Sequence, residues 1–206
     1  MAGVNQLTDA FVNELKDVYH AEKQITKALP KMIKAASNPE LRSAFEHHLD
    51  ETRGQVDRLE SCFESLDLAP KTKTCHGMVG ILEEGAELMK EDGDAAVLDA
   101  MFIAAAQRVE HYEISAYGTL VEWAKQLGLD CRSLLEENLA EEKAADQKLT
   151  RIAEKSINRA AASGREPQLA HDRGRPGERL AQGASRVRKA VTGRKGTSRG
   201  RSARKR

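Results

Sequence analysis

The sequence has few aromatic residues and no long apolar run. Aromatic residues make up 4% of its 206 positions, whereas Ala, Leu, Glu and Lys are abundant, a composition that favours helices over sheet. No apolar stretch reaches the ~20 residues that span a bilayer, and the first residues lead into no signal-peptide core. We therefore expect an all-α, cytoplasmic protein without a membrane segment.

Cysteine is also scarce, with three residues at positions 62, 75 and 131. Their odd number and wide spacing do not fit a zinc knuckle or a redox Cys-x-x-Cys pair. Reduced thiols, the usual state in a cytoplasmic protein, are the simplest interpretation.

Charge is distributed unevenly along the chain. Residues 163–206 hold 14 Lys/Arg and 3 Asp/Glu, which leaves 19 basic and 29 acidic residues in 1–162. The basic part is rich in Gly, Arg, Ser and Pro and lacks apolar periodicity, so it cannot bury enough surface to offset the entropy of ordering. The sequence predicts a folded domain over 1–162 and a disordered basic tail over 163–206.

Apolar residues in the first part recur at the three-and-four spacing of one helical face. This spacing predicts four long helices, with apolar faces over 7–32, 41–63, 98–121 and 135–152, and a shorter helix over 81–89. Asn38-Pro39 is typical of a helix start and Gly128 of a helix end. Two tightly connected helix pairs joined by a crossover predict a ferritin-like up-down four-helix bundle.

Polar side chains interrupt the apolar faces of these helices. Most of these side chains are carboxylates. The full set is Glu22, His48, Glu51, Gln55, Glu110, Glu113, Glu142 and Asp146. Burying an unpaired carboxylate is costly, so such a group must be paired, protonated or bound to a metal.

The spacing of four of these glutamates indicates which alternative applies. Glu22 and Glu51 are 29 residues apart, and so are Glu113 and Glu142. At ~1.5 Å of rise per residue, the two members of each pair reach nearly the same height in an antiparallel helix pair. Four carboxylates together repel unless cations compensate them, and hard oxygen donors on facing helices suit two iron or manganese ions. For any single glutamate a solvated helix face stays an alternative, because 32% of the chain is charged.

Five motifs in order carry a family resemblance. They are Ala21–Gln24, His48–Gln55, Gln107–Ile114, Tyr117–Leu120 and Glu141–Asp146. Over about residues 5–160 they resemble the bacterial YciE/YciF family. The resemblance implies a ferritin-like fold related in shape to rubrerythrin, an association with stress responses and a homodimer.

The wider ferritin pattern implies one glutamate on the first and third helices and Glu-x-x-His on the second and fourth. The four paired glutamates match this pattern, and Glu110 resembles the extra carboxylate on the third helix of rubrerythrin. Both histidines are missing, because Gly54 and Ala145 stand at their positions.

Candidate replacements for the missing histidines are His48, Gln55 and Asp146. His48 as a hydrogen-bonded core residue is an alternative. Tyr19, Tyr112 and Tyr117 either donate hydrogen bonds to the ligands or only pack in the core.

Three functions follow from these features. The glutamate cluster predicts two transition-metal ions, iron first and manganese or zinc as alternatives. Such a site indicates a protein of the stress response that handles metal or peroxide, with oxidase or peroxidase activity left open. The missing histidines favour a metal-free structural or interaction bundle instead. The basic tail, which has no aromatic residue to stack on bases, predicts sequence-independent nucleic-acid contact, with an inert extension as its alternative.

Overall fold

The computed structural model describes residues 4–164. The helices are α1 (Leu7–Ala35), α2 (Pro39–Glu64), α3 (His76–Leu88), α4 (Ala95–Leu127), α5 (Arg132–Ile152), a π-helical turn (Ala153–Ile157) and α6 (Asn158–Ser163). Within these residues there is no strand, so the predicted all-α class is confirmed. The predicted tail, from residue 165 onward, lies outside the described part of the chain.

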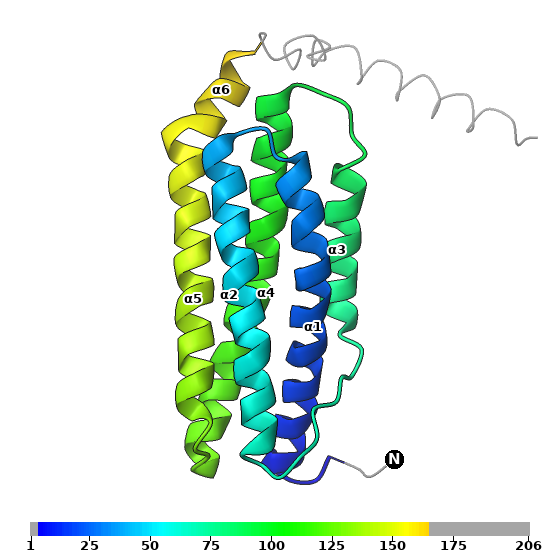
Figure 1. The fold of residues 1–206 in the computed structure, drawn as a ribbon, viewed down its shortest axis with the longest axis vertical. Coiled ribbons are helices and arrows are strands. Elements are labelled where there is room, and N and C mark those ends of the chain that lie inside the picture. The colour runs from blue at the N-terminus through cyan, green and yellow to red at the C-terminus, as the bar shows by residue number, and fades with distance from the viewer. Residues whose placement is uncertain (1–3, 165–206) are drawn as a thin grey trace, which may run out of the picture. The chain divides into compact units, whose positions relative to one another are not determined.

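The four long helices form two antiparallel pairs, α1 with α2 and α4 with α5 (Figure 1). The crossover between α2 and α4 carries the chain back along the bundle, so these two helices run in the same direction. Within the crossover, α3 lies against α1 and α4. The predicted ferritin-like bundle with a short extra helix is therefore confirmed.

Local chemistry fixes several helix ends, among them the start of α2 and the end of α4 that were predicted from the sequence. The side chain of Asn38 accepts two backbone hydrogen bonds at the start of α2, where Pro39 occupies the first turn. Asp94 caps α4 in the same way. Gly128 ends α4 with a φ of 66°, a left-handed conformation that favours glycine. These short ends keep each helix pair in register.

The apolar core consists of two clusters along the bundle. Their buried members come from all four long helices, and they include Ile25, Phe45, Phe102 and Leu149 in one cluster and Phe11, Leu59, Leu120 and Leu135 in the other. Burial of these side chains stabilises the bundle at about 25 cal/mol per Å² of apolar surface. The residues predicted to bind metal fall between the two clusters.

Two of the three cysteines are paired. Cys62 near the end of α2 and Cys131 before α5 form a disulfide, although 69 residues separate them. The prediction of reduced thiols is wrong for this pair, because the fold brings their Cα atoms to 5.0 Å, within the range of a disulfide.

The start of α3 is held against α4 by contacts of Cys75 and Gly77. Cys75 is a buried free cysteine, and its Sγ lies 3.0 Å from the Tyr112 hydroxyl. A Cβ at Gly77 would lie 2.7 Å from the ring of Tyr112, so this close approach requires glycine. The position of α3 along α4 is thereby fixed at its first turn.

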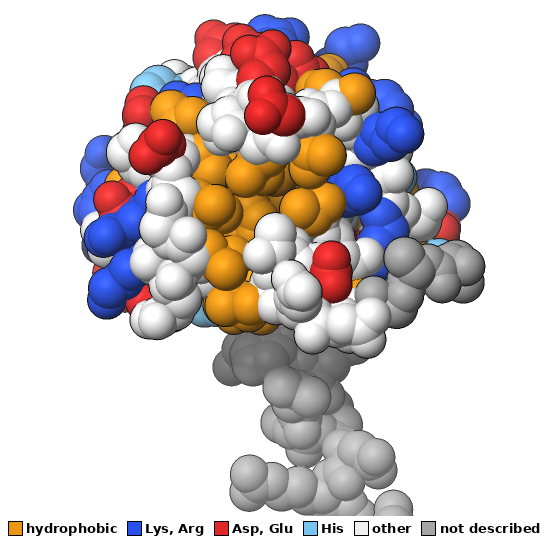
Figure 2. All heavy atoms as spheres, turned by 90° about the horizontal axis from the view of Figure 1, so that it is seen from below, with side chains coloured by type: hydrophobic (Ala, Val, Ile, Leu, Met, Phe, Trp, Pro, Cys, Tyr) orange, Lys and Arg blue, Asp and Glu red, His pale blue; other side chains and the backbone are white. Residues whose placement is uncertain are grey.

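Exposed apolar side chains gather at the lower end of the bundle. Seen from that end, a strip of hydrophobic side chains is bordered by acidic and basic ones (Figure 2). Val4, Leu7 and Leu68 are exposed hydrophobic side chains near the start of α1 and the end of α2. Within residues 4–164, no helix has the length and hydropathy needed to traverse a bilayer.

Candidate metal centre

A layer of buried charge separates the two apolar clusters. Glu22 of α1, His48 of α2, Glu110 and Glu113 of α4 and Glu142 of α5 are each at most 5% exposed. The helical period puts residues 110 and 113 on one face of α4. The antiparallel pairing brings the contributions of the four helices to one height. Glu113 and Glu142 have the predicted 29-residue spacing, whereas α2 contributes His48 to the layer rather than the predicted Glu51.

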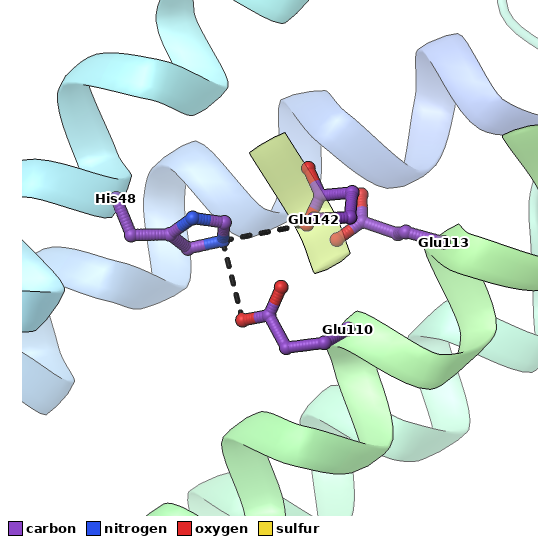
Figure 3. Close-up of side chains that lie close together, drawn as sticks. All are labelled: His48, Glu110, Glu113 and Glu142. Atoms are coloured by element: carbon purple, nitrogen blue, oxygen red, sulfur yellow. Dashed lines mark ion pairs between the residues drawn. The ribbon is translucent and has the colours of Figure 1, made fainter. Parts of the chain in front are cut away.

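Four of these side chains converge closely enough to share one ion. His48, Glu110, Glu113 and Glu142 each offer a ligand atom, and these atoms lie within 4.8 Å of one another. Figure 3 shows the four side chains pointing toward one another. His48 Nε2 lies 3.4 Å from Glu110 Oε1 and 3.9 Å from Glu142 Oε2. Three carboxylates and one imidazole are a donor set that transition metals accept.

The same layer contains polar atoms that are buried without a hydrogen-bond partner. In residues 4–164 these atoms are Glu22 Oε2, both ring nitrogens of His48, Gln55 Oε1, Glu110 Oε2, both carboxylate oxygens of Glu113 and Glu142 Oε2. Leaving so many buried polar atoms unsatisfied is costly. Bound cations would satisfy them, so the residues present fit a metal centre.

Burial and mutual repulsion raise the pKa values of these carboxyls. Burial, with the charge of Glu142, raises the pKa of Glu22 to about 8. Burial also raises the pKa of Glu113 well above its ordinary value, and Glu22 and Glu142 add to the effect. The pKa of Glu110 is raised by burial and by Glu142. Without a cation the layer therefore retains protons near neutral pH, and a bound cation would displace them.

A chain of hydrogen bonds leads from Glu22 toward the surface. The Tyr117 hydroxyl donates to Glu22 Oε1. Asn138 Nδ2 donates to the Tyr117 hydroxyl at 3.0 Å, and Arg58 Nε donates to Asn138 Oδ1. Tyr117 and Asn138 are fully buried, so this chain fixes the orientation of Glu22.

Gln55 of α2 orients Glu142 of α5. It is fully buried, and its Nε2 donates to Glu142 Oε1 and, at 3.1 Å, to Glu141 Oε2. Arg58 also donates to Glu141 and, at 3.1 Å, to Glu137. Arg58 thus links the supports of Glu22 and Glu142.

Glu51 lies at the edge of the layer rather than inside the four-residue group. Its side chain is 24% exposed, and its carboxylate lies 3.0 Å from His47 Nδ1 and 3.6 Å from His48 Nδ1. Burial alone would raise the pKa of Glu51, but the adjacent imidazoles of His48 and His47 hold this pKa below its ordinary value. Glu51 is therefore an ionised carboxylate next to His48.

Asp146 also lies outside the group. Its side chain is 21% exposed, accepts a hydrogen bond from Gln107 at 2.9 Å and lies 3.3 Å from His111 Nε2. Of the three tyrosines, Tyr117 contacts a site carboxylate. Tyr19 donates to Glu60 at 2.5 Å, and Tyr112 contacts Cys75 and Asp17.

Sequence reasoning missed Arg58 and Asn138. Each has a helical relation to a predicted residue, because Asn138 lies four positions before Glu142 and Arg58 three after Gln55. That relation was the available signal, but Arg and Asn are common on solvated faces, so position alone did not distinguish them.

Comparison with known proteins places the chain in a family. Residues 6–162 match the family described as Domain of unknown function (DUF892). The chain belongs to the DUF892 family. Protein YciF of Escherichia coli strain K12 is 46% identical over 157 residues, which are 75% of this chain and 95% of that protein. The resemblance to the YciE/YciF family is therefore confirmed.

Two solved structures agree with the fold. The crystal structure of the E. coli stress protein YciF matches with a TM-score of 0.73 and 46% identity, over 75% of this chain and 99% of that one. YcfI from Rhodopseudomonas palustris, described as a candidate structural protein, matches with a TM-score of 0.70 and 45% identity, over 71% and 94% of the two chains.

Proposed function

We propose that this DUF892 protein binds two transition-metal ions, iron first, in the layer between its core clusters. The observation that carries the proposal is the set of buried, unpartnered oxygen and nitrogen atoms on Glu22, His48, Glu110, Glu113 and Glu142. Neither hydrogen bonds nor burial explains why a helical core would retain five such side chains. Metal binding explains all of them together.

The donor set indicates which metals fit. Carboxylate oxygens dominate, and His48 supplies the one imidazole of the group. Hard oxygen donors favour Fe(II) or Mn(II), while Zn(II) also accepts a mixed oxygen and nitrogen set. Glu51, ionised beside His48, is placed to supply a further oxygen at the edge of the site.

The residues around the site hold the ligands in place. Tyr117 orients Glu22, and Gln55 orients Glu142, so each pair of helices contributes one fixed carboxylate. Bound iron would supply redox exchange with oxygen or peroxide. We infer a role in handling iron or peroxide during stress, supported by the similarity to the E. coli stress protein YciF.

Equilibrium dialysis of the full chain against Fe(II) under anaerobic conditions tests the proposal. About two ions per chain are expected, falling to one or none in Glu113→Gln. Glu46→Gln on the exposed face of α2 is the matched control and should keep both ions. A wild-type protein that retains no Fe(II), Mn(II) or Zn(II) would support the structural or interaction bundle instead.

Two further proposals concern partners. We propose a homodimer, as the family resemblance implies, and sequence-independent nucleic-acid contact by the basic residues of 163–206. Most of that segment lies outside the described residues, so its support is its 14 Lys/Arg against 3 Asp/Glu. Steep loss of DNA retention with added salt would support this contact.

A further inference from the structure

A small apolar cavity lies directly beside the metal layer. Its volume is about 20 Å³, and two of its lining residues are His48 and Glu110 of the four-residue group. The remaining lining residues are eight apolar side chains of α1, α2, α3 and α4, among them Ala28, Leu82 and Ala106. A cavity of this size holds about one small molecule.

The cavity adjoins a larger groove on the surface of the bundle. This groove, of about 320 Å³, lies between α1 and α3. Ala28 of α1 and Leu82 of α3 line both the groove and the cavity, and both are half-buried. These two side chains therefore lie between the groove and the cavity.

The lining determines what can pass. Ions and strongly hydrated molecules lose hydrogen bonds in an apolar cavity, whereas a small apolar molecule loses none. Hydrogen peroxide would lose the partners of its two hydroxyl groups, but dioxygen has none to lose. Ions have a polar approach on another side, where Glu51 and Glu141 are each 24% exposed.

We propose that this cavity binds dioxygen and delivers it to the metal layer, with Ala28 and Leu82 as its gate. The inference rests on the proposed function for what happens at the layer, but the gas site itself needs no metal. The cavity is lined by residues of α1 and α3 on one side and by His48 and Glu110 on the other. The crossover helix α3 therefore forms the outer wall of the access route.

Xenon, an apolar probe, tests the gas site in the metal-free full chain. Under xenon pressure, methyl NMR signals of Leu82 and Val109, which line the cavity, should shift more than those of Leu127 at the far end of α4. Ala106→Leu and Ala28→Leu place extra carbons in the cavity and should abolish these shifts. Ala104→Leu on the exposed face of α4 is the control and should not. Equal shifts at all three methyl positions, or shifts that persist in both cavity variants, would overturn the proposal.

Nitric oxide, a neutral diatomic molecule, tests delivery in the Fe(II)-loaded full chain. Its association rate should fall about tenfold or more in Ala28→Leu, rise in Leu82→Ala and stay unchanged in Ala104→Leu. Oxidation of bound Fe(II) by hydrogen peroxide should not slow in Ala28→Leu, and equal slowing would overturn the assignment to dioxygen. Failure to load Fe(II) would refute the metal proposal instead, and the xenon result alone would then decide whether the cavity is a gas site.

Discussion

Replacing Glu113 by Gln should stabilise the metal-free protein while it removes a ligand. Glu113 is 1% exposed, and both of its oxygens lack a partner. Its pKa is raised well above the ordinary range by burial and by the neighbouring Glu22 and Glu142. Gln has nearly the same shape and no charge, so the variant loses repulsion without creating a cavity.

The size of the effect follows from the spacing of the carboxylates. The ligand atoms of the group lie within 4.8 Å of one another, and two full charges at that distance repel by about 3 kcal/mol at an effective dielectric constant of ~20. Because protonation relieves part of this repulsion, and more of it at lower pH, we expect a gain of about 1–2 kcal/mol at pH 8 and almost none at pH 5. For a domain of this size the gain raises Tm by roughly 2–8 °C.

Thermal unfolding with and without Mn(II) measures both effects of the substitution, the loss of repulsion and the loss of a metal ligand. Without metal, Glu113→Gln should unfold at a higher temperature than wild type, and the exposed control Glu46→Gln should not. At 100 times the dissociation constant, bound metal stabilises wild type by about 2.7 kcal/mol, so the order should reverse. A metal-free Glu113→Gln protein that is less stable than wild type at pH 8 would refute the argument, because Glu113 would then be a structural group.

Three further predictions follow from the layer and from α3. Stability of the metal-free protein should fall as pH rises from about 5 to 8. Folded Glu22, with its pKa raised to about 8, holds a proton that the unfolded chain releases over this range. Urea unfolding at several pH values measures the change, and a stability that rises with pH would contradict the prediction. Tyr117→Phe should lower the free energy of unfolding in urea by about 1–3 kcal/mol, because it leaves buried hydrogen-bond partners unpaired. This loss should exceed that of Tyr19→Phe, whose hydrogen bond is only partly buried. Equal losses in the two variants would contradict the prediction. Gly77→Ala should destabilise the fold by about 1–3 kcal/mol, because the added Cβ forces Tyr112 to shift. Gly80→Ala, with nothing within 4 Å of its Cβ, should be neutral or stabilising. Calorimetry compares the two variants, and a neutral Gly77→Ala would show that Tyr112 moves freely.

The fold and the height of the site were predictable because both depend on helical periodicity. Apolar spacing determined the long helices, and a constant rise per residue placed Glu22 with Glu51 and Glu113 with Glu142 at mid-bundle. Rotation about a helix axis was harder to predict. Glu51 and Asp146 lie at the edge, because they are turned by about 60° and about 40° around the helix axis from His48 and Glu142.

Contacts between distant segments could not be predicted from local patterns. The disulfide between Cys62 and Cys131 depends on how two helix ends meet across 69 residues. The same holds for the hydrogen bonds from Arg58 to Asn138 and from Asn138 to Tyr117. Each of these residues has an ordinary explanation when only its own helix is considered.

Anomalous X-ray diffraction from crystals of the full chain grown with Fe(II) or Mn(II) would show directly whether the buried layer binds metal ions. Metal binding in this layer predicts two anomalous peaks between the core clusters, bounded by Glu22, His48, Glu110, Glu113 and Glu142. The peaks should be absent from crystals of Glu113→Gln or reduced there to one. Anomalous peaks confined to the protein surface, with the five buried side chains bound to no ion, would contradict it.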